Sequence, residues 1–251
     1  MARGEPLDGT LSRSADLQRF YEILDRLRDR VDLRRLADCH GRLNWPARGV
    51  YFFFEGGEQR TTSGTGSRVV RVGTHAITAT SRTTLWDRLS AHRGTAKSGS
   101  GNHRGSVFRL LVGEAMIRRG GLHVPSWAEG GSLGEASLRV RMTREAIRNL
   151  ERPVESAVTL AIGAMPFVWV KVDDPPSTTS QRAFIERNAI ALLSNFGKTS
   201  ADPPSETWLG LDSEKDRVRR SGLWNNNHVE ETYDPTFMDI LDGAADSTAR
   251  P

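Results

Sequence analysis

One segment carries two ionisable side chains on a helical face that should be apolar. A helix is predicted over 83–93, and four of its residues share one face through their i, i+3, i+4 and i+7 spacing: Leu85, Arg88, Leu89 and His92. An unpaired charge beside an apolar face costs free energy, so Arg88 and His92 either reach water at the rim or belong to a site. The spacing alone favours the rim.

A carboxylate repeats this conflict later in the chain. Ser180 is the expected cap of a helix over 184–196, and Glu186 shares a face with apolar residues of that segment: Ala183, Ala189, Ile190 and Leu193. A carboxylate on such a face must be paired, protonated or bound to a metal ion. A salt bridge to Arg182, four residues earlier, is the commoner arrangement.

Tyr51 lies in the strongest strand signal, the aromatic and β-branched run over 50–54. Alone it would be an ordinary core residue. A second strand is predicted over 68–72, after a Gly-, Thr- and Ser-rich hairpin loop over 55–67.

Taken in order, these segments resemble the motifs of GIY-YIG nucleases. Gly49-Val50-Tyr51 resembles the first signature strand of that family, and Arg71-Val72-Gly73 resembles the second. The segment 85–92 resembles the family's Arg-containing helix, which often carries a His one turn later. Together the motifs span roughly residues 45–228.

The family's metal-binding Glu and the Asn that typically follows it also have counterparts. Glu186 matches the Glu, while Asn225, Asn226 and Asn227 are candidates for the Asn and Asn195 is a weaker one. Arg71 replaces the second signature tyrosine, as a basic residue does in some restriction enzymes of the family. The long spacing between Arg88 and Glu186 implies insertions.

The resemblance implies a metal-dependent DNA endonuclease in which Glu186 holds Mg²⁺ or Mn²⁺ with water completing the shell. Arg88 would clamp a phosphoryl oxygen, and Tyr51 would take a proton from water, directly or with help from His92. A free tyrosine titrates near pH 10, so the pKa of Tyr51 would have to be lowered, in part by Arg71.

Arginines elsewhere offer contacts to the backbone of double-stranded DNA. The loop over 98–105 is rich in glycine and leads into a predicted helix, so its backbone N–H groups could approach phosphates. The expected DNA-binding side chains are His103, Arg104, Arg109, Arg217, Arg219 and Arg220. The competing interpretation of the loop is a surface loop without a ligand.

Composition agrees with a polyanionic partner without deciding it. The net charge is +4, and of 35 basic residues only Lys97, Lys171, Lys198 and Lys215 are lysines. No run of about 20 apolar residues exists, so no membrane span is predicted. The polar N-terminal segment is no secretory signal, and Cys39 alone permits neither a disulfide nor a zinc cluster. We therefore expect a cytoplasmic protein.

The remaining pattern predicts an α+β fold with a small mixed or antiparallel sheet flanked by helices. Further helices are expected over 15–31, 106–119 and 143–152, two buried strands over 157–172, and a loop over 120–137. The expected division of the chain is an N-terminal helical extension over 1–40 and a nuclease domain over 41–243 with insertions at about 94–152. A disordered tail over 244–251 completes it, and residues 1–14 are expected to fray.

The leading prediction is a DNA endonuclease of restriction or defence type, because the length and insertions resemble the family's restriction enzymes. Those enzymes commonly work as homodimers, which is one expectation for this chain. The alternative is a nucleic-acid-binding protein with a GIY-YIG-like fold that does not cut. In a third interpretation the resemblance is chance, and Glu186 then lies far from Tyr51.

Overall fold

A small antiparallel sheet forms the centre of the molecule. The computed structural model describes residues 7–95 and 99–248. Its four strands, in the order β1-β4-β2-β3, are β1 (Arg34–Arg35), β4 (Pro166–Lys171), β2 (Gly49–Gln59) and β3 (Ser67–Gly73). Every neighbouring pair is antiparallel. The predicted α+β class with a small antiparallel sheet is confirmed.

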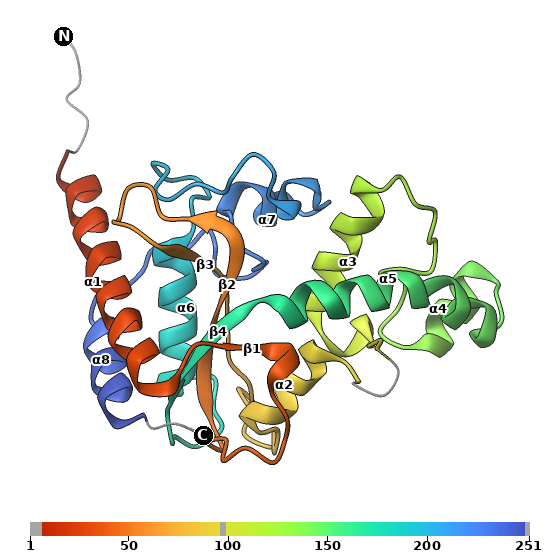
Figure 1. The fold of residues 1–251 in the computed structure, drawn as a ribbon, viewed down its shortest axis with the longest axis horizontal. Helices are drawn as coiled ribbons and strands as arrows, with labels where there is room; N and C mark the ends of the chain where they lie inside the picture. The colour runs from red at the N-terminus through yellow and green to blue at the C-terminus, as the bar shows by residue number, and fades with distance from the viewer. Residues whose placement is uncertain (1–6, 96–98, 249–251) are drawn as a thin grey trace, which may run out of the picture.

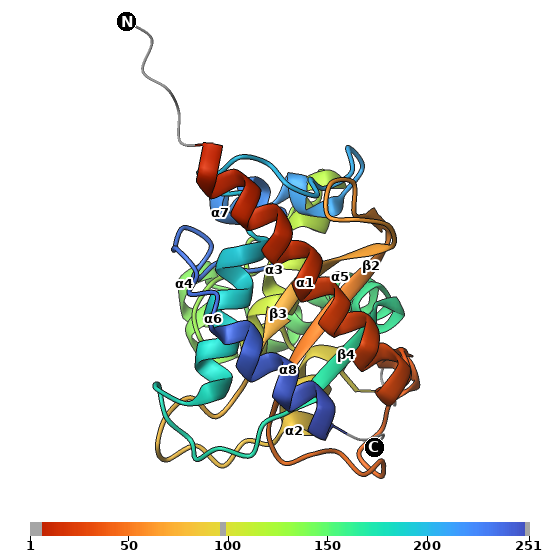
Figure 2. The same cartoon turned by 90° about the vertical axis from the view of Figure 1, so that its left-hand side faces the viewer.

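Helices cover both faces of this sheet. The helices α1 (Leu7–Val31), α6 (Gln181–Leu193) and α8 (Phe237–Ser247) lie on one face (Figure 2). On the other side lie α2 (Leu85–Arg93), α3 (Val107–Arg119) and α5 (Arg144–Ala164) (Figure 1). Alternate side chains of β2 fill the two layers: Phe52 packs on Phe20, whereas Phe53 packs on Phe108.

Short elements connect these layers. They are η1 (Leu36–Asp38), η2 (His103–Gly105), α4 (Leu133–Val140), η3 (Leu209–Asp212) and α7 (Asp216–Ser221). Helix α4 begins inside the predicted loop over 120–137 and ends after it. The Ser132 side chain is its N-cap. The loop prediction is therefore wrong from Leu133 onward.

The prediction of two buried strands over 157–172 is wrong in its first half. Helix α5 continues to Ala164, and only β4 is a strand. Val154, Val158 and Ile162 are buried at helical spacing, while Leu160 is exposed. An uninterrupted apolar run hides this one-sided burial, because its periodicity cannot be read from residue types alone.

Both ends of the described chain are more ordered than expected. Helix α8 includes 244–247, so the tail prediction is wrong there, and Ala245 is buried in the core. Helix α1 begins at Leu7 and buries Phe20, Leu24 and Leu27 against the sheet. Residues 1–6, 96–98 and 249–251, parts of the expected frayed ends and of the loop over 98–105, lie outside the described residues.

Two signature glycines are required by close packing. A Cβ on Gly73 would collide with the hydroxyl and ring of Tyr51, which faces it across β2 and β3. A Cβ on Gly49 would collide with the carbonyl oxygen of Val170 in β4. Each glycine thus lets a neighbouring group approach at the end of β2 where Tyr51 lies.

No described helix is both long enough and apolar enough to cross a membrane.

Candidate active site

A cavity of about 320 Å³ lies beyond the end of β3 and gathers most of the predicted site. Five predicted catalytic residues line it: Arg71, Arg88, His92, Glu186 and Asn225. They come from β3, α2, α6 and the segment after α7, so residues far apart in sequence converge here. Thr74, His75, Asn226, Asn227 and His228 also line this active-site cavity.

Tyr51 lies beneath the cavity and joins it through His92. Its hydroxyl is 2.7 Å from His92 Nε2, and His92 Nδ1 is 2.7 Å from the Ser106 hydroxyl oxygen. All three side chains are buried. The chain Tyr51–His92–Ser106 can therefore pass a proton from the phenol to the imidazole when Nδ1 carries the hydrogen and donates it to Ser106.

The electrostatics correct one expectation about Tyr51. Burial raises the pKa of Tyr51, and the nearby cations Arg71 and Arg88 only partly oppose that effect. The expected lowered pKa is wrong for the protein without substrate. Burial and the cations Arg71 and Arg88 hold the pKa of His92 well below its usual value, so this imidazole is neutral and its Nε2 can accept the hydrogen bond of the Tyr51 hydroxyl.

Glu186 does not form the expected salt bridge with Arg182. The guanidinium of Arg182 pairs with Asp174, while Glu186 Oε1 accepts the backbone N–H of Thr74 at 3.0 Å. Burial raises the pKa of Glu186, although Arg71 and the Thr74 N–H favour its charged form. A bound cation would favour the charged form further.

A single carboxylate fits a hydrated magnesium or manganese ion. Among the described residues, no group of three or more His, Cys, Asp and Glu side chains could hold a metal. Mg²⁺ keeps several waters and often takes only one or two protein carboxylates. Oxygen Oε2 of Glu186 has no hydrogen bond within the described chain and remains available as a ligand.

The two arginines of the cavity differ in their partners. Arg88 is half-buried, and its guanidinium carries no hydrogen bond or ion pair within residues 7–95 and 99–248. The Arg71 guanidinium donates to the carbonyl of Trp224 and lies over the Phe108 ring, 5.5 Å from its centroid. Arg88 is thus free to bind an anion, whereas Arg71 is held beside Tyr51.

The side-chain amide of Asn225 forms hydrogen bonds with the backbone of β3. Its Oδ1 accepts the N–H of Val72 at 3.1 Å, and its Nδ2 donates to the Val72 carbonyl at 2.9 Å. The side chain therefore fixes the segment 225–228 against β3. Asn226 and Asn227 stay on the cavity wall.

Three cavity residues were missed by the sequence analysis. Ser106 contacts His92, and His228 lines the cavity with its Nδ1 2.8 Å from Glu231. His75 Nδ1 donates to the Thr83 carbonyl at 2.8 Å, which leaves its buried Nε2 without a partner in the described chain. Burial lowers the pKa of His75 to about 4. The adjacent Gly73-Thr74-His75 sequence was the only local signal.

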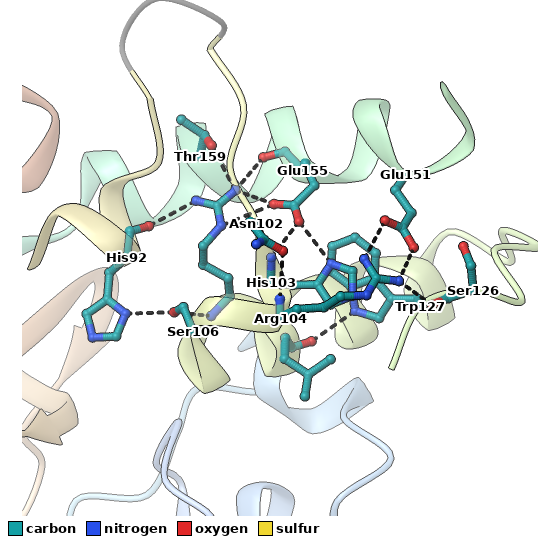
Figure 3. A network of polar contacts seen from close by, with 12 residues as sticks. His92, Asn102, His103, Arg104, Ser106, Ser126, Trp127, Glu151, Glu155 and Thr159 are labelled. Atoms are coloured by element: carbon teal, nitrogen blue, oxygen red, sulfur yellow. Dashed lines mark hydrogen bonds and ion pairs between the residues drawn. The ribbon is translucent and has the colours of Figure 1, made fainter. Parts of the chain in front are cut away.

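Three of the predicted DNA-binding residues use their side chains on partners within the protein, as Figure 3 shows for His103 and Arg104. Arg109 is buried, with its Nε 3.1 Å from Glu155 Oε2 and Nη1 2.9 Å from the His92 carbonyl. His103 Nδ1 donates to Glu155 at 2.9 Å. Arg104 binds both carboxylate oxygens of Glu151, at 2.8 and 2.7 Å. We call the side chains of His103, Arg104, Arg109, Glu151 and Glu155 the internal network.

The internal network is charged and self-contained. Burial opposes ionisation of Glu155, but hydrogen bonds from His103 and Arg109 outweigh it and hold the pKa of Glu155 below its usual value. The His103 ring stacks on Trp127 with centroids 3.9 Å apart. The network therefore supports the start of α3, where Ser106 contacts His92.

The second predicted basic cluster remains on the surface. Arg217 pairs with Glu230 and donates to the Asn226 carbonyl at 3.4 Å, which places it beside the active-site cavity. Arg219 and Arg220 both pair with Asp216 and are partly exposed. Their contact with DNA stays a prediction.

Comparison with known proteins supports this assignment. The GIY-YIG domain family matches residues 11–251, which extends from within α1 to beyond α8. No curated protein and no solved structure matches the chain. A GIY-YIG domain indicates a nuclease acting on DNA, in a family that generally uses divalent metal ions. The homodimer expected from restriction enzymes gains no support from these findings. The chain belongs to the GIY-YIG domain family.

Proposed function

We propose that this protein is a divalent-metal-dependent DNA endonuclease that hydrolyses phosphodiester bonds. The observation that carries the proposal is the convergence of Arg88, Glu186 and the His92–Tyr51 pair on one cavity. Phosphodiester hydrolysis needs a nucleophilic water, positive charge near the phosphoryl oxygens and stabilisation of the leaving oxygen. The cavity offers a group for each need.

In the proposed reaction a water attacks phosphorus and the bond to the leaving oxygen breaks. The water proton moves to the Tyr51 oxygen while the Tyr51 proton moves to neutral His92 Nε2, and the leaving oxygen takes a proton from solvent. Arg88 binds a phosphoryl oxygen through its free guanidinium. Glu186 would hold the Mg²⁺ or Mn²⁺ ion, which supplies positive charge to the phosphoryl and leaving oxygens.

Plasmid cleavage by the wild type and Glu186→Gln, with Mg²⁺, Mn²⁺ or EDTA, tests this proposal. The glutamine can still accept the Thr74 N–H, so the fold should persist while the negative ligand is lost. We expect metal-dependent cutting by the wild type and none by the variant. Glu22→Gln removes the same charge from an exposed site on α1 and should cut normally.

The opposite results are informative. Cutting in EDTA, or full activity of Glu186→Gln, would contradict the metal role. Absence of cutting with retained gel shift would favour the alternative, a binding protein that does not cleave. The replacement of the second signature tyrosine by Arg71 is the observation that favours this alternative.

We further propose a restriction or defence role, because the expected insertion at about 94–152, which covers α3, α4 and the start of α5, resembles the insertions of the family's restriction enzymes. Challenge of cells that express the wild type or Glu186→Gln with unmodified phage DNA tests it. Protection that needs Glu186 is expected. Equal infection of both strains would contradict the role without touching the chemistry.

A further inference from the structure

A large cavity lies among α4, α5 and the segment 100–105, within the expected insertion and away from the catalytic groups. Its volume is about 930 Å³. Helix α5, the start of α4 and the segment 100–105 surround it, with Arg148 and Arg152 of α5 on its wall. We call it the insertion cavity. Neither the family match nor the proposed chemistry assigns it a role.

Charge in the insertion cavity is positive. Its two carboxylates are already neutralised, since Glu151 binds Arg104 through two hydrogen bonds and Glu155 binds Arg109. Figure 3 shows the Glu151 carboxylate turned toward Arg104. Arg148 has no ion pair within the described residues, and Arg152 donates only to the Asn149 amide oxygen at 2.8 Å. Both side chains are exposed, so two unpaired guanidinium groups face the solvent side of this cavity.

A third hollow lies between the insertion cavity and the active-site cavity and shares lining residues with both. That hollow is lined by Arg88, His75 and Asp87, and it shares Gly105 with the insertion cavity. It also shares Arg88 and His75 with the active-site cavity. The carboxylate of Asp87 is engaged by Thr84 in the cap of α2. The three hollows therefore adjoin one another along a surface path from Arg88 past Gly105 to Arg148.

Gly105 leaves this path clear. A Cβ at Gly105 would meet no atom within 4 Å, and its backbone is not in the left-handed region. The internal network holds the wall of the path rigid from His92 to Glu151 (Figure 3). An extended, negatively charged ligand that occupies Arg88 can thus continue along one fixed surface.

We propose that the insertion cavity binds the DNA backbone that flanks the scissile phosphate, with Arg148 and Arg152 contacting its phosphates. This inference rests on the proposed endonuclease function. Contacts to phosphate position DNA without reading sequence, and each contact adds to the salt dependence of binding. The insertion would therefore lengthen the footprint of the enzyme on one side of the cut.

Binding of fluorescent duplexes of two lengths tests the assignment. In the Glu186→Gln background, Arg148→Ala/Arg152→Ala should raise the Kd of a duplex of about 30 base pairs roughly tenfold or more and flatten its salt slope by about 2. A duplex of about 10 base pairs, one helical turn, offers fewer flanking phosphates and should lose much less affinity. Arg19→Ala/Arg26→Ala removes the same charge from α1, on the opposite face, and is the matched control.

A second pair of variants tests the path itself. Gly105→Asp places a carboxylate between the two cavities, and Gly56→Asp adds the same charge at an exposed glycine of β2 whose Cβ also meets no atom within 4 Å. Only Gly105→Asp should weaken binding of the long duplex. Circular dichroism melting of both variants shows that folding is retained.

The outcomes separate the two proposals. Suppose the wild type cuts with metal, but Arg148→Ala/Arg152→Ala binds the long duplex as tightly as its parent. This result overturns the proposal that the insertion cavity binds DNA and leaves the proposed endonuclease function standing. An equal loss in the α1 control, or in the short duplex, overturns the insertion-cavity proposal as well, because the effect is then one of net charge. A wild type that neither binds nor cuts any duplex overturns both.

Discussion

Two neighbouring regions of this protein contain the same residue types and use them oppositely. In the active-site cavity, Arg88 has no partner in the described chain and Glu186 keeps one oxygen free. In the internal network, Arg109 and Glu155 bind one another, and their other hydrogen-bonding groups are used by His92, His103 and Thr159. The comparison teaches that an arginine and a glutamate near a cavity indicate a site only when their hydrogen-bonding capacity is not already used.

The largest expected effect lies in the internal network. Arg109→Met should lower the free energy of unfolding by about 3–5 kcal/mol, because it leaves the Glu155 carboxylate buried without its main partner. Thermal or urea unfolding measures the change. Arg109→Met/Glu155→Gln should recover much of the loss, and a double variant as unstable as the single one would contradict the charge argument.

Arg88→Ala should lower the cleavage activity and leave the stability of the fold almost unchanged. Its cleavage rate should fall about 10²–10³-fold, because a charge on the phosphoryl oxygen is lost. Its unfolding free energy should stay within about 0.5 kcal/mol of the wild type, since no protein partner is removed. Single-turnover cleavage and urea unfolding of the same preparation measure both quantities. A large destabilisation would place Arg88 with the structural arginines.

Ser106 lies where the two regions meet and should affect both modestly. Ser106→Ala removes the N-cap of α3, at a cost of about 1 kcal/mol, and the partner of His92 Nδ1. We expect cleavage to fall about tenfold, a fraction of what general base catalysis contributes. Ser106→Thr keeps the hydroxyl and should restore activity. Activity that tracks only the melting temperature would contradict a role in positioning His92.

The last expected effect is a dependence of the free energy of unfolding on pH. It should come from the buried imidazole of His75 in the active-site cavity. Burial lowers the pKa of His75 to about 4 in the fold, below the unfolded value of about 6.5. The unfolded chain therefore binds the proton first, so stability is full above about pH 6.5 and falls as pH drops toward 4. His75→Asn should flatten this slope in urea unfolding. An unchanged slope would assign the loss to other groups.

Local sequence patterns were sufficient for the elements that carry the signature residues. The aromatic run of β2 and the helical spacing of Leu85, Arg88 and Leu89 predicted elements that the structure contains. Glycines at 49 and 73 matched a family pattern, and their physical reason is the close approach of β4 and of Tyr51. Such contacts lie within one hairpin or between adjacent strands.

What the sequence could not reveal depends on distant partners. The inward turn of Arg104 and Arg109 is decided by Glu151 and Glu155, which follow more than forty residues later. The contact of Asn225 with Val72 spans 153 residues. Residue types at 103–109 are equally compatible with a DNA-binding loop, so only the tertiary pairing distinguishes the two interpretations.

The amide of Asn225 has a consequence for the behaviour of the protein in solution. Strand β3 is the outer strand of the sheet on the side of the cavity, and an outer strand with free N–H and C=O groups invites pairing with a second chain. Trp224 N–H donates to the Val70 carbonyl at 2.7 Å, and Asn225 occupies both groups of Val72. The segment that contains Trp224 and Asn225 therefore covers part of the edge of β3 and disfavours pairing with a second chain there.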